Sequence, residues 1–245
     1  MQRPGLFGKL YRLGVHVKLY FKFPDSFFRD LKMLRRKPQA RKRGIIYHPS
    51  NFIFRKGINE NSVIVDVGCG YEADFSRHMI SCYGARAYAI DPTEKHKKYL
   101  QKIEETSGGK FVYLQNAVSS VSGDLLFYEI ENHESGSLFS DHTNIKQDVT
   151  ISYHVRSLTL KEIPQKIGHS RIDLIKLDIE GAEFDLFNDI QAKDIQVYDQ
   201  IYIEFHHKAI ESKSFADTQR IIDILGEMGF TNFSLDDLNY LFYRV

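Results

Sequence analysis

Acidic and glycine residues at the ends of predicted strands are the groups in this sequence best suited to chemistry. Asp66 ends a β-branched run and is followed by Gly68-Cys69-Gly70, and Asp91 ends the next run. Close glycines let a backbone approach a ligand, and a carboxylate at the second strand accepts hydrogen bonds from ribose hydroxyls. Asn116 and Ala117 follow the third run, where they are placed to flank an adenine ring. Together these residues predict a nucleoside-binding site.

The glycine pattern is compatible with two classes of ligand. Gly-x-Gly-x-x-Ala from Gly68 to Ala73 is close to a dinucleotide fingerprint. However, Glu72 and Asp74 follow the glycines directly, and their charges would repel a pyrophosphate. A cationic ligand without phosphate, such as S-adenosylmethionine, tolerates these carboxylates. We therefore favour S-adenosylmethionine over a dinucleotide, and the sequence contains no P-loop motif.

A second group of ionisable residues follows two later predicted strands: Asp178, Glu180, Glu183, Glu204 and His206. If these strands are neighbours, the side chains converge at the carboxyl edge of the sheet. Repulsion among carboxylates raises the pKa of some members, which suits a general base. His206 is the first candidate for that base and Glu180 the second, with a merely packed histidine as the alternative. Asp178 is assigned to catalysis and to positioning the cofactor.

The remaining acidic residues of this group are assigned to an acceptor substrate. Glu183 and Glu204 receive that role, although Glu204 is equally suited to a structural hydrogen bond. Ser137 joins them because it lies in the long segment 130–149, which we expect to cover the acceptor rather than form a surface excursion. Asp178, Glu204 and His206 also offer ligands for magnesium or manganese. Their spacing is not diagnostic, so a metal is not favoured.

Alternating strands and helices must position these residues. Helices are predicted over 73–82, 93–105, 183–189 and 215–228. Strands are predicted over 62–66, 87–91, 111–114, 125–129, 149–155, 172–178, 200–206, 230–234 and 240–244. Alternation of this kind predicts a Rossmann-like, doubly wound α/β fold with a mostly parallel sheet, and the last two strands predict a C-terminal antiparallel hairpin.

The charge of the chain is divided between two parts. Residues 1–58 contain 15 basic and 2 acidic residues, whereas the whole 245-residue chain has a net charge of only +1. We therefore predict a basic, aromatic-rich and partly helical extension over residues 1–50 and a catalytic domain over residues 51–245. The extension is expected to dock on the acidic remainder, or to contact an anionic membrane surface or glycan through residues 1–43. Nucleic acid is the least favoured partner.

Composition excludes several classes of protein. Apolar residues make up 42% of the chain and charged residues 27%, as in ordinary globular proteins. Two cysteines do not make a disulfide scaffold. We find neither a signal peptide nor an apolar stretch of about 20 residues that would span a membrane. The sequence therefore predicts a cytoplasmic protein, with peripheral association with a membrane as an alternative.

Two motifs carry a resemblance to a known family. Residues 65–70 resemble motif I of class I S-adenosylmethionine-dependent methyltransferases. Residues 176–183, Lys-Leu-Asp-Ile-Glu-Gly-Ala-Glu, resemble the more specific Lys-x-Asp-x-Glu-Gly-x-Glu signature of the FkbM family. The resemblance covers about residues 50–245 and implies S-adenosylmethionine as the cofactor. It further implies methyl transfer to a hydroxyl oxygen of a sugar, a glycan or another small molecule.

The sequence leaves two alternatives to an O-methyltransferase, namely a nucleic-acid methyltransferase and a non-catalytic scaffold. A nucleic-acid methyltransferase would use the basic N-terminus, but an acidic catalytic edge repels phosphates. The Asn/Asp-Pro-Pro-Tyr/Phe motif of base N-methylation is also absent from the sequence. A non-catalytic scaffold would keep the fold without the chemistry, and the intact set of acidic residues argues against it.

Overall fold

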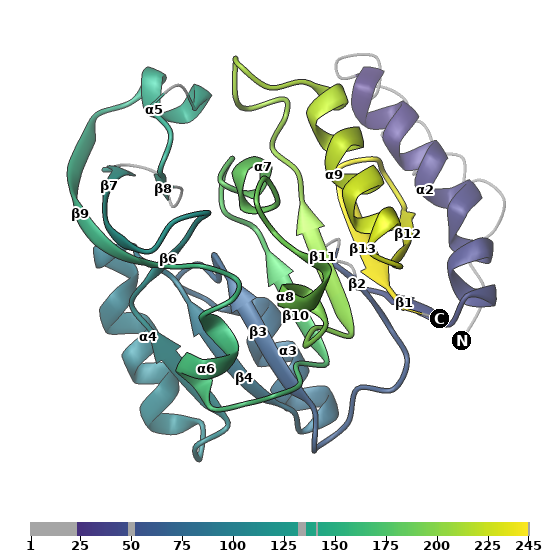
Figure 1. Cartoon of the computed structure of the whole chain (residues 1–245), viewed down its shortest axis with the longest axis horizontal. Coiled ribbons are helices and arrows are strands. Elements are labelled where there is room, and N and C mark those ends of the chain that lie inside the picture. Colours follow the sequence, from purple (N-terminus) through teal and green to yellow (C-terminus); the bar gives the residue numbers. More distant parts are fainter. Residues whose placement is uncertain (1–23, 49–51, 132–135, 141, 245) are drawn as a thin grey trace, which may run out of the picture.

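The computed structural model describes residues 24–48, 52–131, 136–140 and 142–244. A seven-stranded sheet forms its centre, with the order β12-β13-β11-β10-β3-β4-β5 (Figure 1). The strand bounds are β3 Val63–Val67, β4 Arg86–Ile90, β5 Phe111–Leu114, β10 Leu174–Leu177, β11 Gln200–Glu204, β12 Thr231–Ser234 and β13 Asn239–Tyr243. The five strands from β11 to β5 are parallel, whereas β13 is antiparallel to both neighbours. The predicted fold class is confirmed.

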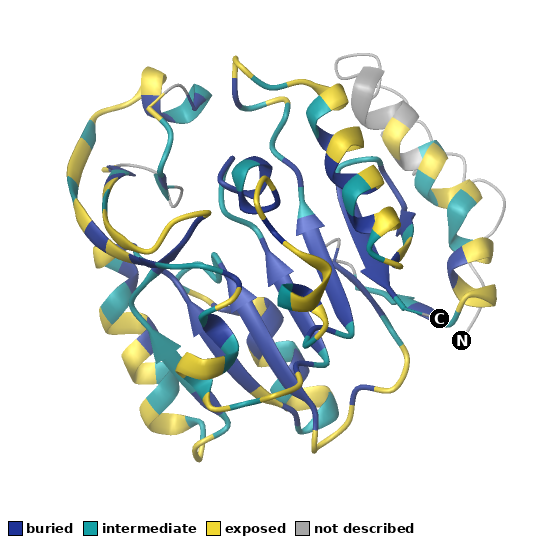
Figure 2. Ribbon diagram, viewed as in Figure 1, coloured by how far each residue is buried: buried dark blue, intermediate teal, exposed yellow. Residues whose placement is uncertain are grey.

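The central strands are buried on both faces, as their continuous apolar runs predict (Figure 2). Alternate residues point to opposite sides, so that Val65 joins one apolar cluster and Ile64 the other. Helices α3 (Asp74–Tyr83) and α4 (Glu94–Thr106) pack against the Ile64 side. The Val65 side is covered by α6 Ile163–Ile167, α7 Glu183–Leu186, α8 Ala192–Ile195 and α9 Phe215–Glu227.

A smaller sheet stands beside the carboxyl ends of the central strands. It has the order β6-β9-β7-β8, and a short helix, α5, lies next to it (Figure 1). The bounds are β6 Ala117–Val118, β7 Gly123–Ile130, β8 Gly136–Ser137, β9 Thr150–Leu158 and α5 Thr143–Gln147. Strands predicted at 125–129 and 149–155 are thus present, but they pair with each other outside the central sheet.

The basic N-terminal part is docked on the C-terminal hairpin. Helix α2 (Pro24–Lys42) places Lys32 and Arg36 against the carboxylate of Asp237. Strands β1 (Ile45–Tyr47) and β2 (Ile53–Arg55) pair across the expected domain boundary at residue 50. Residues 1–23 of the predicted extension lie outside the described residues, so the contact of residues 1–43 with a membrane stays a prediction. Within the described ranges, no helix combines the length and apolarity needed to cross a membrane.

Candidate functional site

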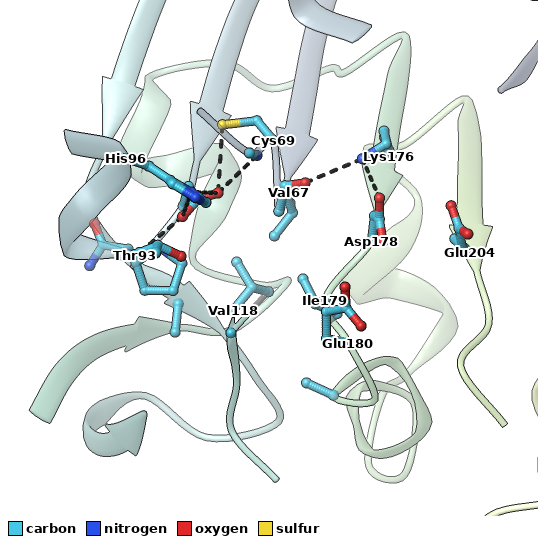
Figure 3. A pocket seen from close by; sticks show the side chains of 18 of the residues that line it. Val67, Cys69, Thr93, His96, Val118, Lys176, Asp178, Ile179, Glu180 and Glu204 are labelled. Carbon is cyan, nitrogen blue, oxygen red and sulfur yellow. Dashed lines mark hydrogen bonds and ion pairs between the residues drawn. The ribbon is translucent and has the colours of Figure 1, made fainter. Parts of the chain in front are cut away.

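A cavity of about 360 Å³ opens at the carboxyl ends of β3, β4, β10 and β11. This volume is in the range of small-molecule sites. The chain order reverses here, because β4 and β5 continue on one side of β3 while β10 and β11 lie on the other. Figure 3 shows Cys69, Thr93 and His96 at one end and Asp178, Glu180 and Glu204 at the other. The cavity therefore has two chemically different ends.

Gly68 allows the loops after β3 and β10 to come into contact. Its φ is +71°, and a Cβ atom there would lie 1.7 Å from the carbonyl oxygen of Asp178. No other residue type fits without moving one of these loops. Gly70, with φ +65°, donates its N–H to Asp91 Oδ2 at 2.9 Å. Both glycines line the cavity, as predicted for a cofactor loop.

Asp91 is the buried acceptor at the nucleoside end. Its carboxylate accepts the N–H of Gly70 and that of Thr93, each at 2.9 Å, and lies 3.3 Å from His96 Nδ1. Burial opposes ionisation of Asp91, but the hydrogen bonds from His96 and Thr93 outweigh it and lower its pKa. Asp91 is therefore ionised at neutral pH. His96 was not among the predicted site residues; only its position five residues after Asp91, one turn into a helix, could have indicated it.

Three further residues predicted to bind the cofactor line the same end: Cys69, Asn116 and Ala117. Burial raises the pKa of the Cys69 thiol well above its ordinary value, and the carboxylate of Asp91 adds to this effect. Cys69 is thus no thiolate nucleophile. Asn116 is held by a hydrogen bond from its Nδ2 to the carbonyl oxygen of Arg156 at 3.2 Å. These residues fit an uncharged adenosine moiety.

Asp66 lies behind the cavity rather than in its wall. It is fully buried and accepts hydrogen bonds from the N–H and Oγ of Ser76 at 3.2 and 2.8 Å. Burial raises its pKa, while the nearby charge of Lys176 opposes the shift. This corrects the prediction that Asp66 contacts the cofactor directly. Asp66 ties the first turn of α3 to β3 and thereby positions the glycine loop between them.

Lys176 links the two ends of the cavity, and the sequence analysis assigned it no role. Its Nζ lies 3.0 Å from Asp178 Oδ2, 3.3 Å from the carbonyl oxygen of Gly68 and 3.5 Å from Asp66 Oδ1. Burial opposes its charge, yet the carboxylates of Asp178 and Asp66 raise its pKa above the ordinary value. A lysine inside an apolar strand was the available signal, since such residues are rarely buried without partners. The positive charge of Lys176 therefore offsets the negative charge of Asp178 at the cavity wall.

His206 is anchored by a buried carboxylate. Glu183 Oε1 accepts the backbone N–H of His206 at 2.7 Å and lies 3.0 Å from its Nδ1. Burial lowers the pKa of His206, but the charges of Glu183, Glu180 and Asp178 overcome this and raise it to about 10. A group that keeps its proton at neutral pH is a poor general base there, so this pKa speaks against the predicted role of His206 as the base. Strand β11 also ends at Glu204, so His206 lies beyond it.

Two residues predicted to contact the acceptor are buried supports. Glu183 is fully buried and also accepts the N–H of Gly181 at 2.9 Å. Ser137 is buried and donates its Oγ–H to the carbonyl oxygen of Glu180 at 2.7 Å. Neither lines the cavity, which corrects both assignments. Ser137 instead fixes a strained backbone, because Glu180 has φ +50° in the left-handed region.

Glu180 and Glu204 do line the acidic end of the cavity. Burial raises the pKa of Glu204 to about 7, and the charge of Asp178 adds to the effect. Glu180 lies 3.0 Å from Nε2 of His142, which segment 130–149 brings over the site. His142 is buried and belongs to the segment that the sequence predicts to cover the acceptor, although no role of its own was assigned to it. His133, in the same segment, lies outside the described residues.

The fold and this divided cavity define a Rossmann-like enzyme that binds a nucleoside ligand at the switch point of its sheet. A family model described as the methyltransferase FkbM domain matches residues 60–231. The chain belongs to this methyltransferase family, as its sequence motifs predicted. S-adenosylmethionine is its cofactor. A search of curated proteins gives no match.

Solved structures with a similar fold include several methyltransferases. Fibrillarin from Methanococcus jannaschii, a pre-rRNA processing protein, is 12% identical, covers 81% of this chain and 69% of its own, and gives a TM-score of 0.44. TrmK from M. capricolum, solved with S-adenosyl-homocysteine, is 13% identical, covers 76% of this chain and 62% of its own, and gives a TM-score of 0.40. Fibrillarin from Aeropyrum pernix, with natively bound S-adenosyl-L-methionine, is 9% identical, covers 78% of this chain and 70% of its own, and gives a TM-score of 0.43. At this distance the likenesses carry no argument about the acceptor.

Proposed function

We propose that this enzyme methylates a hydroxyl oxygen of a sugar, a glycan or another small molecule. The observation that carries the proposal is the position of Glu204, whose carboxylate lines the acidic end of the cavity together with Asp178 and Glu180. Burial and the charge of Asp178 raise the pKa of Glu204 to about 7. A general base works best when its pKa lies near the working pH. S-adenosylmethionine supplies an electrophilic methyl group, and the chain must orient a hydroxyl and take up its proton.

The nucleoside end is suited to holding the cofactor. Gly68 and Gly70 present backbone at the cavity wall, and the ionised carboxylate of Asp91 supports its assignment to the ribose hydroxyls. We assign Asn116 and Ala117, which line the same end, to the adenine ring. Among the described lining residues the one lysine or arginine is Lys176, which Asp178 and Asp66 already pair with, so the wall offers little to a phosphate group.

The acidic end is suited to a neutral, hydroxylated acceptor. Asp178, Glu180 and Glu204 offer carboxylate oxygens that accept hydrogen bonds from hydroxyl groups. Glu204 takes the proton of the attacking hydroxyl, and His206 Nε2 lies 3.5 Å from Asp178 and 3.6 Å from Glu180, where it orients both carboxylates. A phosphate backbone would meet repulsion here. This arrangement argues against the nucleic-acid alternative, and the ionisable cavity argues against a scaffold without chemistry.

The experiment is a transfer assay with methyl-labelled S-adenosylmethionine and separate pools of sugars, phenolic alcohols, thiols and RNA. Calorimetry with S-adenosylmethionine, with NAD as the control, first establishes binding. We expect label on a hydroxyl acceptor and none on RNA. The Glu204→Gln variant should keep cofactor binding and lose transfer. Transfer to RNA, or to a thiol only, would overturn the proposal.

The exposed face of α2 favours a peripheral location at an anionic membrane, which we also propose. Leu34 is 63% exposed, and Arg35 and, two turns further along α2, Arg41 and Lys42 are exposed as well. An apolar side chain among basic ones suits a negatively charged lipid surface. Sedimentation of the full chain with phosphatidylserine vesicles, but not with neutral vesicles, is the expected result. Equal sedimentation with both would contradict it.

A further inference from the structure

Three side chains of the acidic end converge on one point. Asp178, Glu180 and His206 each present one ligand-type atom, and these atoms all lie within 4.8 Å of one another. His206 Nε2 is 3.5 Å from Asp178 Oδ1 and 3.6 Å from Glu180 Oε2. Neighbouring ligands around an octahedral ion at about 2.1 Å lie roughly 3 Å apart. A small inward movement would therefore give the spacing of a metal site.

Neighbouring groups hold two of these three side chains in a ligating orientation. Glu183 Oε1 lies 3.0 Å from His206 Nδ1, which leaves Nε2 facing the two carboxylates. Lys176 Nζ lies 3.0 Å from Asp178 Oδ2, which leaves Oδ1 facing His206. Carboxylate partners of this kind orient the histidine ligands of metal sites. The sequence suggests Glu204 as the partner of Asp178 and His206, whereas in the structure Glu180 is the third member of the group.

His142 lies against the third side chain of the cluster, Glu180. It is only 1% exposed, and its Nε2 lies 3.0 Å from Glu180 Oε2. Its Nδ1 accepts the N–H of Asn144 at 3.3 Å, so Nε2 carries the ring proton in the neutral form. The buried ring thereby orients the Glu180 carboxylate toward the point that the three side chains share.

The charges around the cluster favour an added cation. Three carboxylates, Asp178, Glu180 and Glu183, lie 3.0 to 3.6 Å from the ring nitrogens of His206. A divalent cation that replaces the ring proton keeps this negative charge compensated at close range. Two carboxylates with one imidazole suit manganese.

We propose that Asp178, Glu180 and His206 bind one divalent cation, Mn²⁺ in preference to Mg²⁺. The cation's remaining positions face the cavity, where they are open to water and to two oxygens of a vicinal-diol acceptor. This inference deepens the proposed function and rests on it for the role of the cation, but not for its binding. The imidazole ring of His206 binds after giving up its Nε2 proton to solvent.

The test measures Mn²⁺ binding without turnover. The full chain with S-adenosyl-homocysteine bound is titrated with Mn²⁺, and free Mn²⁺ is followed by electron paramagnetic resonance. We expect one Mn²⁺ per chain, with affinity reduced at least tenfold in Glu180→Gln and His206→Gln. The control is Glu105→Gln, an exposed carboxylate on α4. It should bind Mn²⁺ like the unmodified chain.

Unchanged S-adenosyl-homocysteine affinity in each variant shows that it is folded. Absence of Mn²⁺ binding to the unmodified chain at millimolar Mn²⁺ would overturn the inference. Equal Mn²⁺ affinity in all variants would overturn it as well, because the ion would then be bound elsewhere. Mn²⁺ binding without methylation of any hydroxyl acceptor would count against the proposed O-methylation and leave the metal site standing.

Discussion

Glu183 binds His206 at two points, accepting its backbone N–H at 2.7 Å and lying 3.0 Å from its Nδ1. The two residues are far apart in the chain, on α7 and in the turn after β11, and the fold brings them together at the floor of the acidic end. This pair fixes the ring and its charge. It therefore decides which neighbouring group is free to act as a base.

Stability should fall as the pH rises through the range in which His206 loses its proton. The pKa of His206 in the folded chain is raised to about 10, against about 6.5 when unfolded. A raised pKa means that the folded state binds the proton more tightly than the unfolded state does. The resulting contribution to the free energy of unfolding is complete below about pH 6.5 and is lost as the pH approaches 10. Urea titrations at pH 6, 8 and 10, with a chelator present, measure this loss.

The matched variant for this effect is His206→Gln, which keeps a polar side chain without the charge. Its free energy of unfolding should decline less between pH 6 and pH 10 than that of the unmodified chain. The same decline in both proteins would show that other groups cause the pH dependence. Replacing Glu183 is a less specific test of the Glu183–His206 pair, because this substitution also removes a buried acceptor of two backbone N–H groups.

Replacement of Glu204 should abolish the rise of activity with pH. With a pKa of about 7, Glu204 is half ionised near neutrality, so kcat should increase through pH 7 and level off above it. Glu204→Gln should lower kcat by about 10²- to 10⁴-fold and remove this midpoint. The profile is measured with chelator present and S-adenosylmethionine saturating. A midpoint near 7 that persists in Glu204→Gln would assign the base to another residue.

Asp91→Ala should weaken S-adenosylmethionine binding by about 100-fold, the cost of two hydrogen bonds to a charged group. The carboxylate also holds Gly70 and Thr93, so part of the loss reflects a loosened glycine loop. Calorimetry measures the affinity, and Asp124→Asn on β7, an exposed acid away from the cavity, is the control. Unchanged affinity in Asp91→Ala would contradict the ribose assignment.

Gly68→Ala should destabilise the fold by more than about 2 kcal/mol, because its Cβ would overlap the carbonyl oxygen of Asp178. Gly108→Ala is a matched control, since Gly108 has φ +63° and open space around its Cβ. Both variants carry the strain of a left-handed alanine, and only Gly68→Ala adds the clash. Urea unfolding gives the difference. Equal losses of unfolding free energy in Gly68→Ala and Gly108→Ala would mean that the loops after β3 and β10 separate easily.

The sequence by itself determined the central fold and the cofactor. Its apolar runs predict the parallel strands because both faces of these strands are buried. Asp91, Gly68 and Gly70, which the sequence assigns to the cofactor, line the cavity, since strand ends and glycines fix their positions locally. The Lys-x-Asp-x-Glu-Gly-x-Glu signature indicated the family that the domain match confirms.

Only the tertiary structure decided which of the ionisable residues can react. Asp66, Glu183 and Ser137 are buried where segments distant in the chain pack together, so the sequence could not show that they are supports. The raised pKa values of His206 and Glu204 depend on burial and on charges brought in by other strands and turns. His142 reaches Glu180 through a second sheet that the local pattern did not predict. Burial and charge are set by long-range contacts, and these arise only when the chain is folded.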